Sequence, residues 1–198
     1  MKLRRILPVL AAFAAACGGG DAGDPGADPG ASSQPAPAAP AFEPPTGPMS
    51  MPDWFELDEG AQTVNLAITA GLTRDNNYWN YNGAIRGALA INVPEGYTVT
   101  IDFVNSDPNM AHSIGVSDEL TNFTLPPDVV PVFAGAISEN PGSMLEGTMP
   151  GESETIQFVA DAAGTYTLVC YIPGHTAIGM WLYFIVTGDG AAGVQGAD

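Results

Sequence analysis

The sequence predicts an all-β protein, a sandwich or a barrel, from about residue 51 onward. Apolar and polar residues alternate with a period of two in several short runs, and Pro- and Gly-containing turn signals separate these runs. No stretch repeats its apolar residues with the 3.6-residue period of a helix. A domain of about 135 residues is long enough to bury a substantial core.

The alternation is clearest in three early runs and continues in the last third of the chain. Its apolar positions are Val64, Leu66 and Ile68; Leu89, Ile91 and Val93; Val99, Ile101 and Phe103; Ile156 and Phe158; Tyr166 and Leu168; and Trp181, Tyr183 and Ile185. The segment 121–151 is different, because it contains five prolines and little alternation. Its apolar residues Val129, Val130, Val132 and Phe133 predict that it packs over the body of the domain.

The N-terminus has the pattern of an export signal over residues 1–16. Basic residues fill positions 2, 4 and 5, and the apolar stretch that follows is much shorter than the roughly 20 residues that span a bilayer. The stretch ends in Ala14-Ala15-Ala16-Cys17, which resembles the cleavage site of bacterial lipoproteins and predicts lipidation of Cys17. The alternative is ordinary cleavage at the same small residues, which would release a soluble protein.

Residues 17–50 form a Gly-, Pro-, Asp- and Ala-rich linker, which we expect to be a disordered tether. A domain over 51–188 and a flexible tail over 189–198 follow. Without residues 1–16 the chain has 22 acidic residues, two arginines and no lysine. Such a charge disfavours nucleic acid and anionic lipid as partners and suits a basic protein, although it is equally typical of a solubility or saline-habitat trait.

The residues that indicate chemistry lie between two expected strands, 165–169 and 181–186. Cys170, His175 and Met180 share one tight loop, and His112 is the only other histidine of the chain. Two imidazoles, a thiolate and a weak thioether are the donor set of a trigonal copper site with a long axial bond. Zinc accepts the same donors. Each residue alone has an ordinary explanation as a core or turn residue, but together they predict a metal site.

The order of one upstream His followed by Cys-x4-His-x4-Met resembles the cupredoxin family. The Cys-x-x-Pro-Gly-His run resembles that of azurins, and the ligand spacing is similar to that of rusticyanins and sulfocyanins. The resemblance to sulfocyanins is the most extensive and spans about 77–186, with these matching motifs: Asn80-Tyr81-Asn82-Gly83, Val93-Pro94-Glu95-Gly96-Tyr97-Thr98-Val99, His112-Ser113, Gly164-Thr165-Tyr166 and Gly179-Met180-Trp181.

This resemblance implies a Greek-key β-sandwich, one type 1 copper and single-electron transfer in a respiratory chain. We expect a carrier and not an enzyme, because a catalytic copper would need further histidines; the alternative is a copper chaperone or storage protein. The expected partners are redox proteins such as a c-type cytochrome or a terminal oxidase. The expected form is a monomer, lipid-anchored on the outer face of a bacterial membrane, in the periplasm or at the cell surface.

Two expectations concern the surroundings of the metal. Ser113 should hydrogen-bond across to the Cys170 loop, and the Ile172 N–H should donate to the Cys170 sulfur, which Pro173 cannot do. His175 should present an exposed ring edge, within an apolar patch ringed by acidic residues, where electrons enter and leave.

Overall fold

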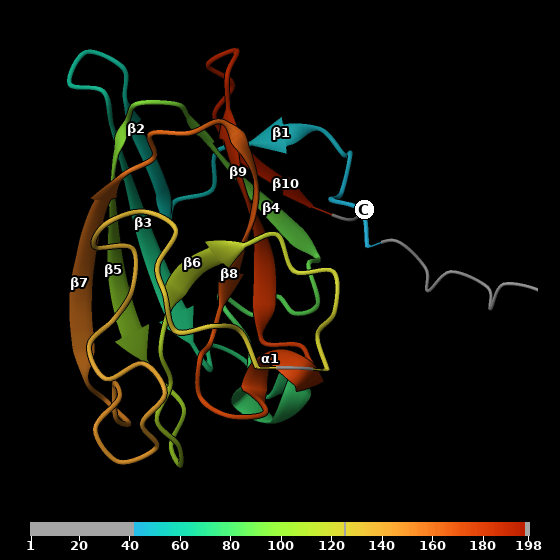
Figure 1. The fold of residues 1–198 in the computed structure, drawn as a ribbon, viewed down its shortest axis with the longest axis vertical. Coiled ribbons are helices and arrows are strands. Elements are labelled where there is room, and N and C mark those ends of the chain that lie inside the picture. Colours follow the sequence, from blue (N-terminus) through green and yellow to red (C-terminus); the bar gives the residue numbers. More distant parts are fainter. Residues whose placement is uncertain (1–41, 125, 197–198) are drawn as a thin grey trace, which may run out of the picture. The chain divides into compact units, whose positions relative to one another are not determined.

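The computed structural model describes residues 42–124 and 126–196, which form two β-sheets packed face to face (Figure 1). The expected all-β sandwich is confirmed. The expectations for residues 1–16, for Cys17 and for the linker up to residue 41 lie outside the described residues. Within the described part of the chain, no helix has the length and apolar character needed to cross a membrane.

The larger sheet has six strands and the smaller has four. In spatial order the larger sheet consists of β1 (Met49–Ser50), β10 (Gly193–Gly196), β4 (Leu89–Pro94), β9 (Trp181–Thr187), β8 (Gly164–Val169) and β6 (Gly115–Asp118). The smaller sheet consists of β2 (Phe55–Asp58), β3 (Thr63–Ala70), β5 (Thr98–Asn105) and β7 (Ser153–Val159). Two single turns of helix, η1 (Asp75–Tyr78) and α1 (His175–Ile178), lie at one end of the sandwich (Figure 1).

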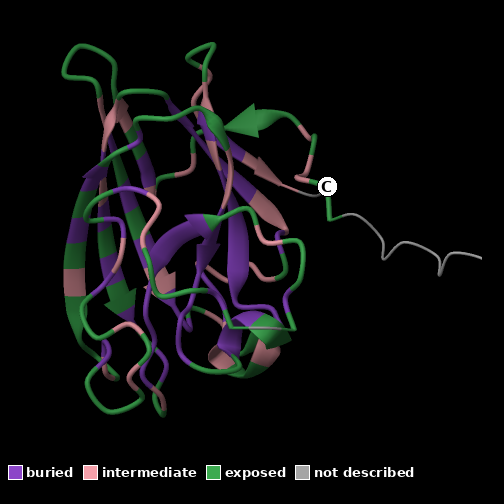
Figure 2. Cartoon of the chain, viewed as in Figure 1, coloured by how far each residue is buried: buried purple, intermediate pink, exposed green. Residues whose placement is uncertain are grey.

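The smaller sheet buries one face, as the period-two pattern predicts. Along β3 and β5 every second side chain is buried against the opposite sheet, and the residues between them are exposed or partly exposed (Figure 2). Burying one aliphatic side chain of this size contributes roughly 1.5–3 kcal/mol. β3 and β5 run parallel, as do β4 and β9, so the chain crosses between the sheets to connect them.

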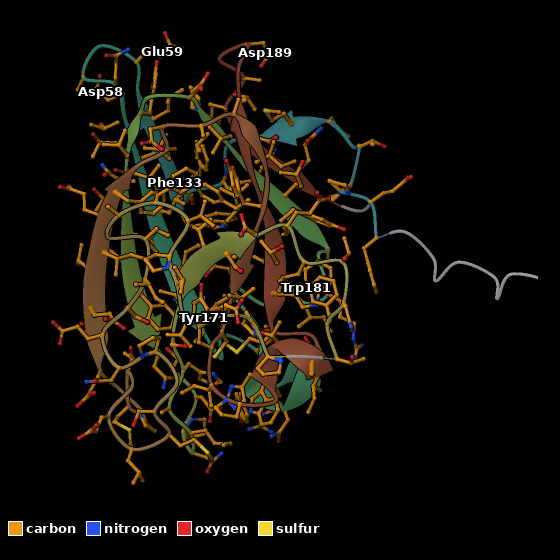
Figure 3. All side chains as sticks on the ribbon, viewed as in Figure 1. Asp58, Glu59, Phe133, Tyr171, Trp181 and Asp189 are labelled. Carbon is orange, nitrogen blue, oxygen red and sulfur yellow. The ribbon has the colours of Figure 1, made fainter. Side chains whose placement is uncertain are left out.

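The larger sheet is buried on both faces along β9. Leu182 and Phe184 pack into the core between the sheets. Trp181, which is labelled in Figure 3, and Tyr183 belong to a second apolar cluster on the outer face. Phe123 stacks on Trp181 there, with ring centroids 3.9 Å apart. The alternation expected from Trp181, Tyr183 and Ile185 therefore marks the outer face, because a strand that is apolar on both faces does not show in its sequence which face packs inward.

The proline-rich segment 121–151 packs on the domain, as its apolar residues predict. The Val132 N–H donates to the carbonyl oxygen of Val116, and the Ser138 N–H donates to that of Ile114. Phe133 is buried in the main core, although Val129 and Val130 remain exposed. The segment therefore continues the larger sheet beyond its short edge strand β6.

Both ends of the domain differ from the expected boundaries. Gly193–Gly196, placed by sequence in a flexible tail, forms β10 and pairs with β4. Met49–Ser50, placed in the linker, forms β1 and pairs with β10. Val194 is buried, and the Asn92 amide donates to the carbonyl of Gly193 and to the side chain of Gln195. β1 has only two residues, and β10 begins and ends with Gly, so neither strand can show an apolar period and only tertiary pairing orders them.

Candidate metal centre

The structure brings three of the expected ligands together. One donor atom from each of His112, Cys170 and His175 lies within 4.8 Å of the other two, and all three residues are buried. His112 follows β5 and is held by a two-way backbone pair with Thr148. Cys170 directly follows β8, and His175 is the first residue of α1.

The three donor atoms form a triangle that fits one metal ion. The two imidazoles present Nδ1 to each other at 3.2 Å, and the Cys170 sulfur lies 3.5 Å from Nδ1 of His175 and 3.9 Å from Nδ1 of His112. An ion at the centre, with bonds of about 2.0–2.3 Å as zinc makes to the same donor types, would hold the donors about 3.5–3.8 Å apart. The observed separations of 3.2, 3.5 and 3.9 Å lie close to this range, so small shifts of the side chains would fit the donors around one ion.

The loop from Cys170 to Met180 is closed by its own backbone. The Cys170 N–H donates to the Met180 carbonyl, and the Met180 N–H donates to the carbonyl of His175. Gly174 has a φ of 87° and Gly179 a φ of 122°, values at which a side chain is strained. Met180 itself is fully buried in the main core. The turn therefore returns Met180 to the strand pair that carries Cys170.

Ser113 and Ile172 both lie beside Cys170. The Ser113 hydroxyl accepts a hydrogen bond from the Tyr171 N–H at 2.9 Å, and its oxygen is 3.7 Å from the Cys170 sulfur. Burial raises the pKa of the Cys170 thiol, while hydrogen bonds from the backbone of Ser113 and of Ile172 oppose that shift. Hydrogen-bond donors that stabilise a thiolate thus surround the Cys170 sulfur, which burial alone would keep protonated.

His112 has a partner that the sequence analysis did not assign. Its Nε2 lies 2.9 Å from a carboxylate oxygen of Asp107, and both side chains are buried. Burial lowers the pKa of His112, and the neighbouring carboxylate partly offsets that change. An acidic residue five positions before a candidate ligand was the available signal.

The prediction that His175 presents an exposed ring edge is wrong. The residue is only 1% exposed, because the indole of Trp79 stacks on its ring with centroids 3.8 Å apart and an interplanar angle of 18°. Its Nε2 is buried and has no hydrogen-bond partner among the described residues. Burial, and then the proximity of His112, lowers the pKa of His175 to about 3. The ring is therefore neutral and able to bind a metal over a wide range of pH.

The motif Asn80-Tyr81-Asn82-Gly83 helps to hold Trp79 in place over the ring of His175. The Asn80 amide donates to the carbonyls of Thr73 and Asp75, which ties the loop that carries Trp79. The fully buried Tyr81 donates from its hydroxyl to the Ser113 carbonyl at 2.6 Å. One short loop thus places one aromatic ring over His175 and a second beside the backbone that follows His112.

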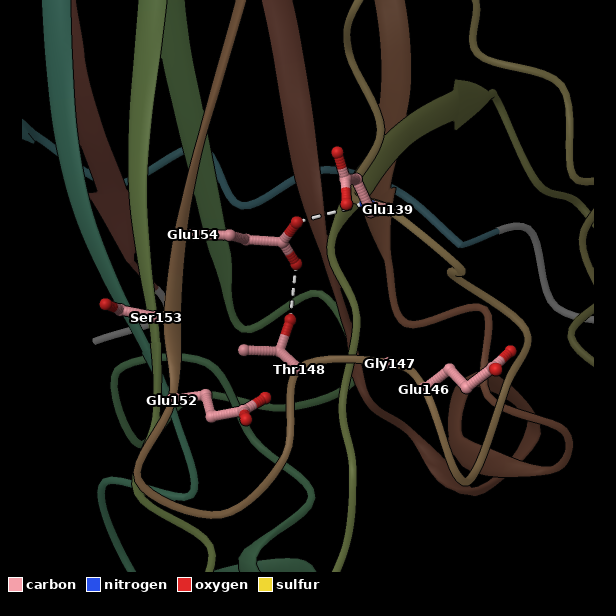
Figure 4. Close-up of a pocket in the computed structure, with 7 residues that line it drawn as sticks. All are labelled: Glu139, Glu146, Gly147, Thr148, Glu152, Ser153 and Glu154. Carbon is pink, nitrogen blue, oxygen red and sulfur yellow. Dashed lines mark hydrogen bonds between the residues drawn. The ribbon is translucent and has the colours of Figure 1, made fainter.

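An acidic pocket of about 180 Å³ is lined in part by Thr148, the residue whose backbone pairs with His112 (Figure 4). Its carboxylates fasten the protein's own chain: Glu154 accepts from the Thr148 hydroxyl and from the Glu139 N–H, and Glu152 accepts from the Met149 N–H. These bonds anchor the segment whose backbone pairs with His112.

An all-β sandwich that encloses two imidazoles and one thiolate, with a methionine at the end of the Cys–His loop, defines a mononuclear copper centre of the cupredoxin class. The chain belongs to the family described as the sulfocyanin (SoxE) domain, whose sequence profile matches residues 54–193. The expected family is thereby confirmed, and the cofactor of the chain is one type 1 copper.

Characterised relatives agree with this family. The chain is 29% identical over 133 residues to sulfocyanin of Sulfolobus acidocaldarius, a match that covers 65% of each protein. It is 35% identical over 97 residues to rusticyanin of Acidithiobacillus ferrooxidans, a match that covers 48% of this chain and 59% of the relative. The matches thus span less than two thirds of these relatives' length.

Solved structures similar to this one include an auracyanin and a rusticyanin. Auracyanin of Roseiflexus castenholzii aligns with a TM-score of 0.44 and 27% identity, covering 62% of this chain and 96% of that protein. Rusticyanin of Thiobacillus ferrooxidans aligns with a TM-score of 0.45 and 21% identity, covering 68% of this chain and 87% of that protein.

Proposed function

We propose that this protein is a mononuclear blue-copper electron carrier, with His112, Cys170 and His175 as the equatorial ligands and Met180 as the axial one. The observation that carries this proposal is the triangle of buried donors, two Nδ1 atoms and one sulfur between 3.2 and 3.9 Å apart. The thiolate and thioether favour Cu(I), and the imidazoles suit both oxidation states. When bound, the copper supplies a one-electron redox couple.

The protein's own residues favour a carrier over an enzyme. The three donors and Met180 are at most 1% exposed, so they offer no donor position at the surface where a substrate could reach the metal. Backbone pairs at His112 and across the Cys170–Met180 loop restrain the donors. Restrained donors need little rearrangement when an electron is gained or lost. A copper chaperone or store, the alternative function, would instead have to release its ion readily.

The test is an optical spectrum of the copper-loaded protein before and after reduction. A carrier shows an intense visible thiolate-to-copper band that reduction removes, whereas a store holds colourless Cu(I) and yields it to a chelator. Cys170→Ser should abolish the band, and the matched variant Cys17→Ser should retain it. Met180→Gln should keep the band but lower the reduction potential. A full band in Cys170→Ser would contradict the ligand assignment.

We further propose that partners approach the α1 end of the sandwich. An apolar hollow of about 200 Å³ lies there, lined by Thr124, Pro126, Pro127, Ile172, Pro173, Gly174, Thr176 and Ala177. Ile178 next to it is exposed, and Arg86 donates to its carbonyl, so a cation lies at the border of this patch, where a ring of acidic residues was expected. A weakly polar contact surface suits a carrier, which must release each partner.

The acidic chain fits a basic redox partner, such as a c-type cytochrome or a terminal oxidase subunit of a respiratory chain. Electron transfer to a basic cytochrome should slow as salt rises, because the screening length is only about 8 Å at physiological ionic strength. Reduction by an uncharged small molecule is the control and should respond little to salt. A rate of electron transfer to the cytochrome that stays constant or rises with salt would contradict electrostatic steering. Transfer at the full rate by the Ile178→Asp variant would contradict the proposed contact at the apolar patch.

The N-terminal pattern supports an extracytoplasmic protein that is lipid-anchored through Cys17 to the outer face of a bacterial membrane. Fractionation of cells tests this: Cys17→Ser should move the protein from the membrane to the soluble fraction. If the variant stays with the membrane, the anchor lies elsewhere.

A further inference from the structure

The carboxylate of Asp107 is an unusual feature of this centre. Asp107 is only 2% exposed, and in residues 42–124 and 126–196 its contact with His112 is the one pair of a basic side chain and a carboxylate within 4.0 Å. One carboxylate oxygen lies 2.9 Å from Nε2 of His112, and the other accepts from the Asn109 N–H at 2.8 Å. Burying a carboxylate is costly, so this placement needs a compensating role.

The loop that carries Asp107 is firmly built. The Asn105 side chain accepts from the Asp107 N–H at 2.9 Å and donates to the carbonyls of Met110 and Thr148, each at 2.8 Å. Gly71 packs so closely on the Asp107 backbone that a Cβ there would lie 2.7 Å from its nitrogen. The hydrogen bonds of Asn105 and the packing of Gly71 therefore fix the backbone of Asp107, which keeps its carboxylate next to His112.

We propose that Asp107 is a positioning residue that fixes the tautomer and orientation of His112 and biases the centre toward its oxidised state. This inference rests on the proposed copper function. An acceptor at Nε2 keeps the ring proton there, which leaves the Nδ1 lone pair directed at the donor triangle. The negative charge behind the ring favours the more positive metal ion, and the buried surroundings screen that charge weakly.

The first test is the reduction potential of the copper-loaded full chain. Asp107→Asn keeps the shape of the side chain and an oxygen acceptor but removes the charge, so the potential should rise while the visible band is retained. Asp107→Ala also removes the acceptor, so it should raise the potential and alter the band as well. Asp102→Asn is the matched control: it removes one carboxylate that bonds only the Thr155 hydroxyl on the sheet surface, and it should leave the potential nearly unchanged.

The second test needs no variant. In the copper-free full chain, where no metal at Nδ1 dictates the tautomer, ¹⁵N–¹H NMR should place the His112 proton on Nε2 and show it to be protected from exchange. A proton on Nδ1, or a freely exchanging one, would overturn the inference even if the Asp107 variants fail to fold. So would a blue Asp107→Asn protein with the potential of the Asp102→Asn control. A wild-type protein without the visible band would instead refute the copper-carrier function itself.

Discussion

Removing the hydroxyl of Tyr81 tests how much the buried polar network behind the metal centre contributes to stability. Tyr81→Phe deletes the donor that lies 2.6 Å from the Ser113 carbonyl, in surroundings where Tyr81 has no exposed surface. A buried carbonyl that loses its partner costs about 1–3 kcal/mol. With a urea dependence of about 2 kcal/mol per molar, the unfolding midpoint should fall by about 0.5–1.5 M.

Tyr166→Phe is the matched control. The Tyr166 hydroxyl also donates to a backbone carbonyl, that of Ala162 at 3.0 Å, but this bond is exposed to solvent. Water replaces the lost partner there, so the free energy of unfolding should change by no more than about 0.5 kcal/mol. Both variants are measured as apoproteins, so that copper binding does not add to the stability. Equal midpoint shifts would refute the argument that burial of the Tyr81 bond sets its contribution.

Three further predictions follow from the loops around the centre. The pKa of His175 is about 3 in the folded protein and near 6.5 when unfolded, so the unfolded apoprotein binds more protons between these values. Its free energy of unfolding should therefore fall as pH falls from about 6.5 toward 3. In the His175→Gln variant the free energy of unfolding should depend less steeply on pH. The same pH dependence in the variant and in the wild type would show that other groups cause it. Gly179→Ala places a Cβ on a residue with a φ of 122°, 2.6 Å from Cγ of Arg86. It should lower the free energy of unfolding by about 1–3 kcal/mol, measured by thermal unfolding. The control Gly60→Ala should lower it by about 0.5 kcal/mol or less. Trp79→Ala should uncover His175 and speed exchange of its Nε2 proton in the reduced, copper-loaded protein, whereas unchanged exchange would show that Trp79 is not its cover.

The sequence indicated the candidate metal ligands but not the residues that support them. His112, Cys170, His175 and Met180 form a pattern because their donor types are rare in the chain and their spacing is short. Asp107 and Tyr81 lie on loops that fold against the centre, and their positions in the sequence do not indicate which groups their side chains contact. Trp79 lies 96 positions before the histidine that it covers, and its stacking depends on the packing of η1 against α1. The expected exposure of His175 failed for this reason.

The sequence by itself determined the all-β class, the inner faces of β3 and β5 and the donor set, because alternation and rare ligand types are local signals. Only the tertiary structure decided which face of β9 packs inward, because that strand is apolar on both sides. It also decided that residues 193–196 form a strand rather than a tail, since their order comes from hydrogen bonds to β4. The buried Asp107–His112 pair likewise exists only where the 105–112 loop is folded against Gly71 and Thr148. Contacts of this kind depend on how segments meet in space, and no periodicity within one segment encodes them.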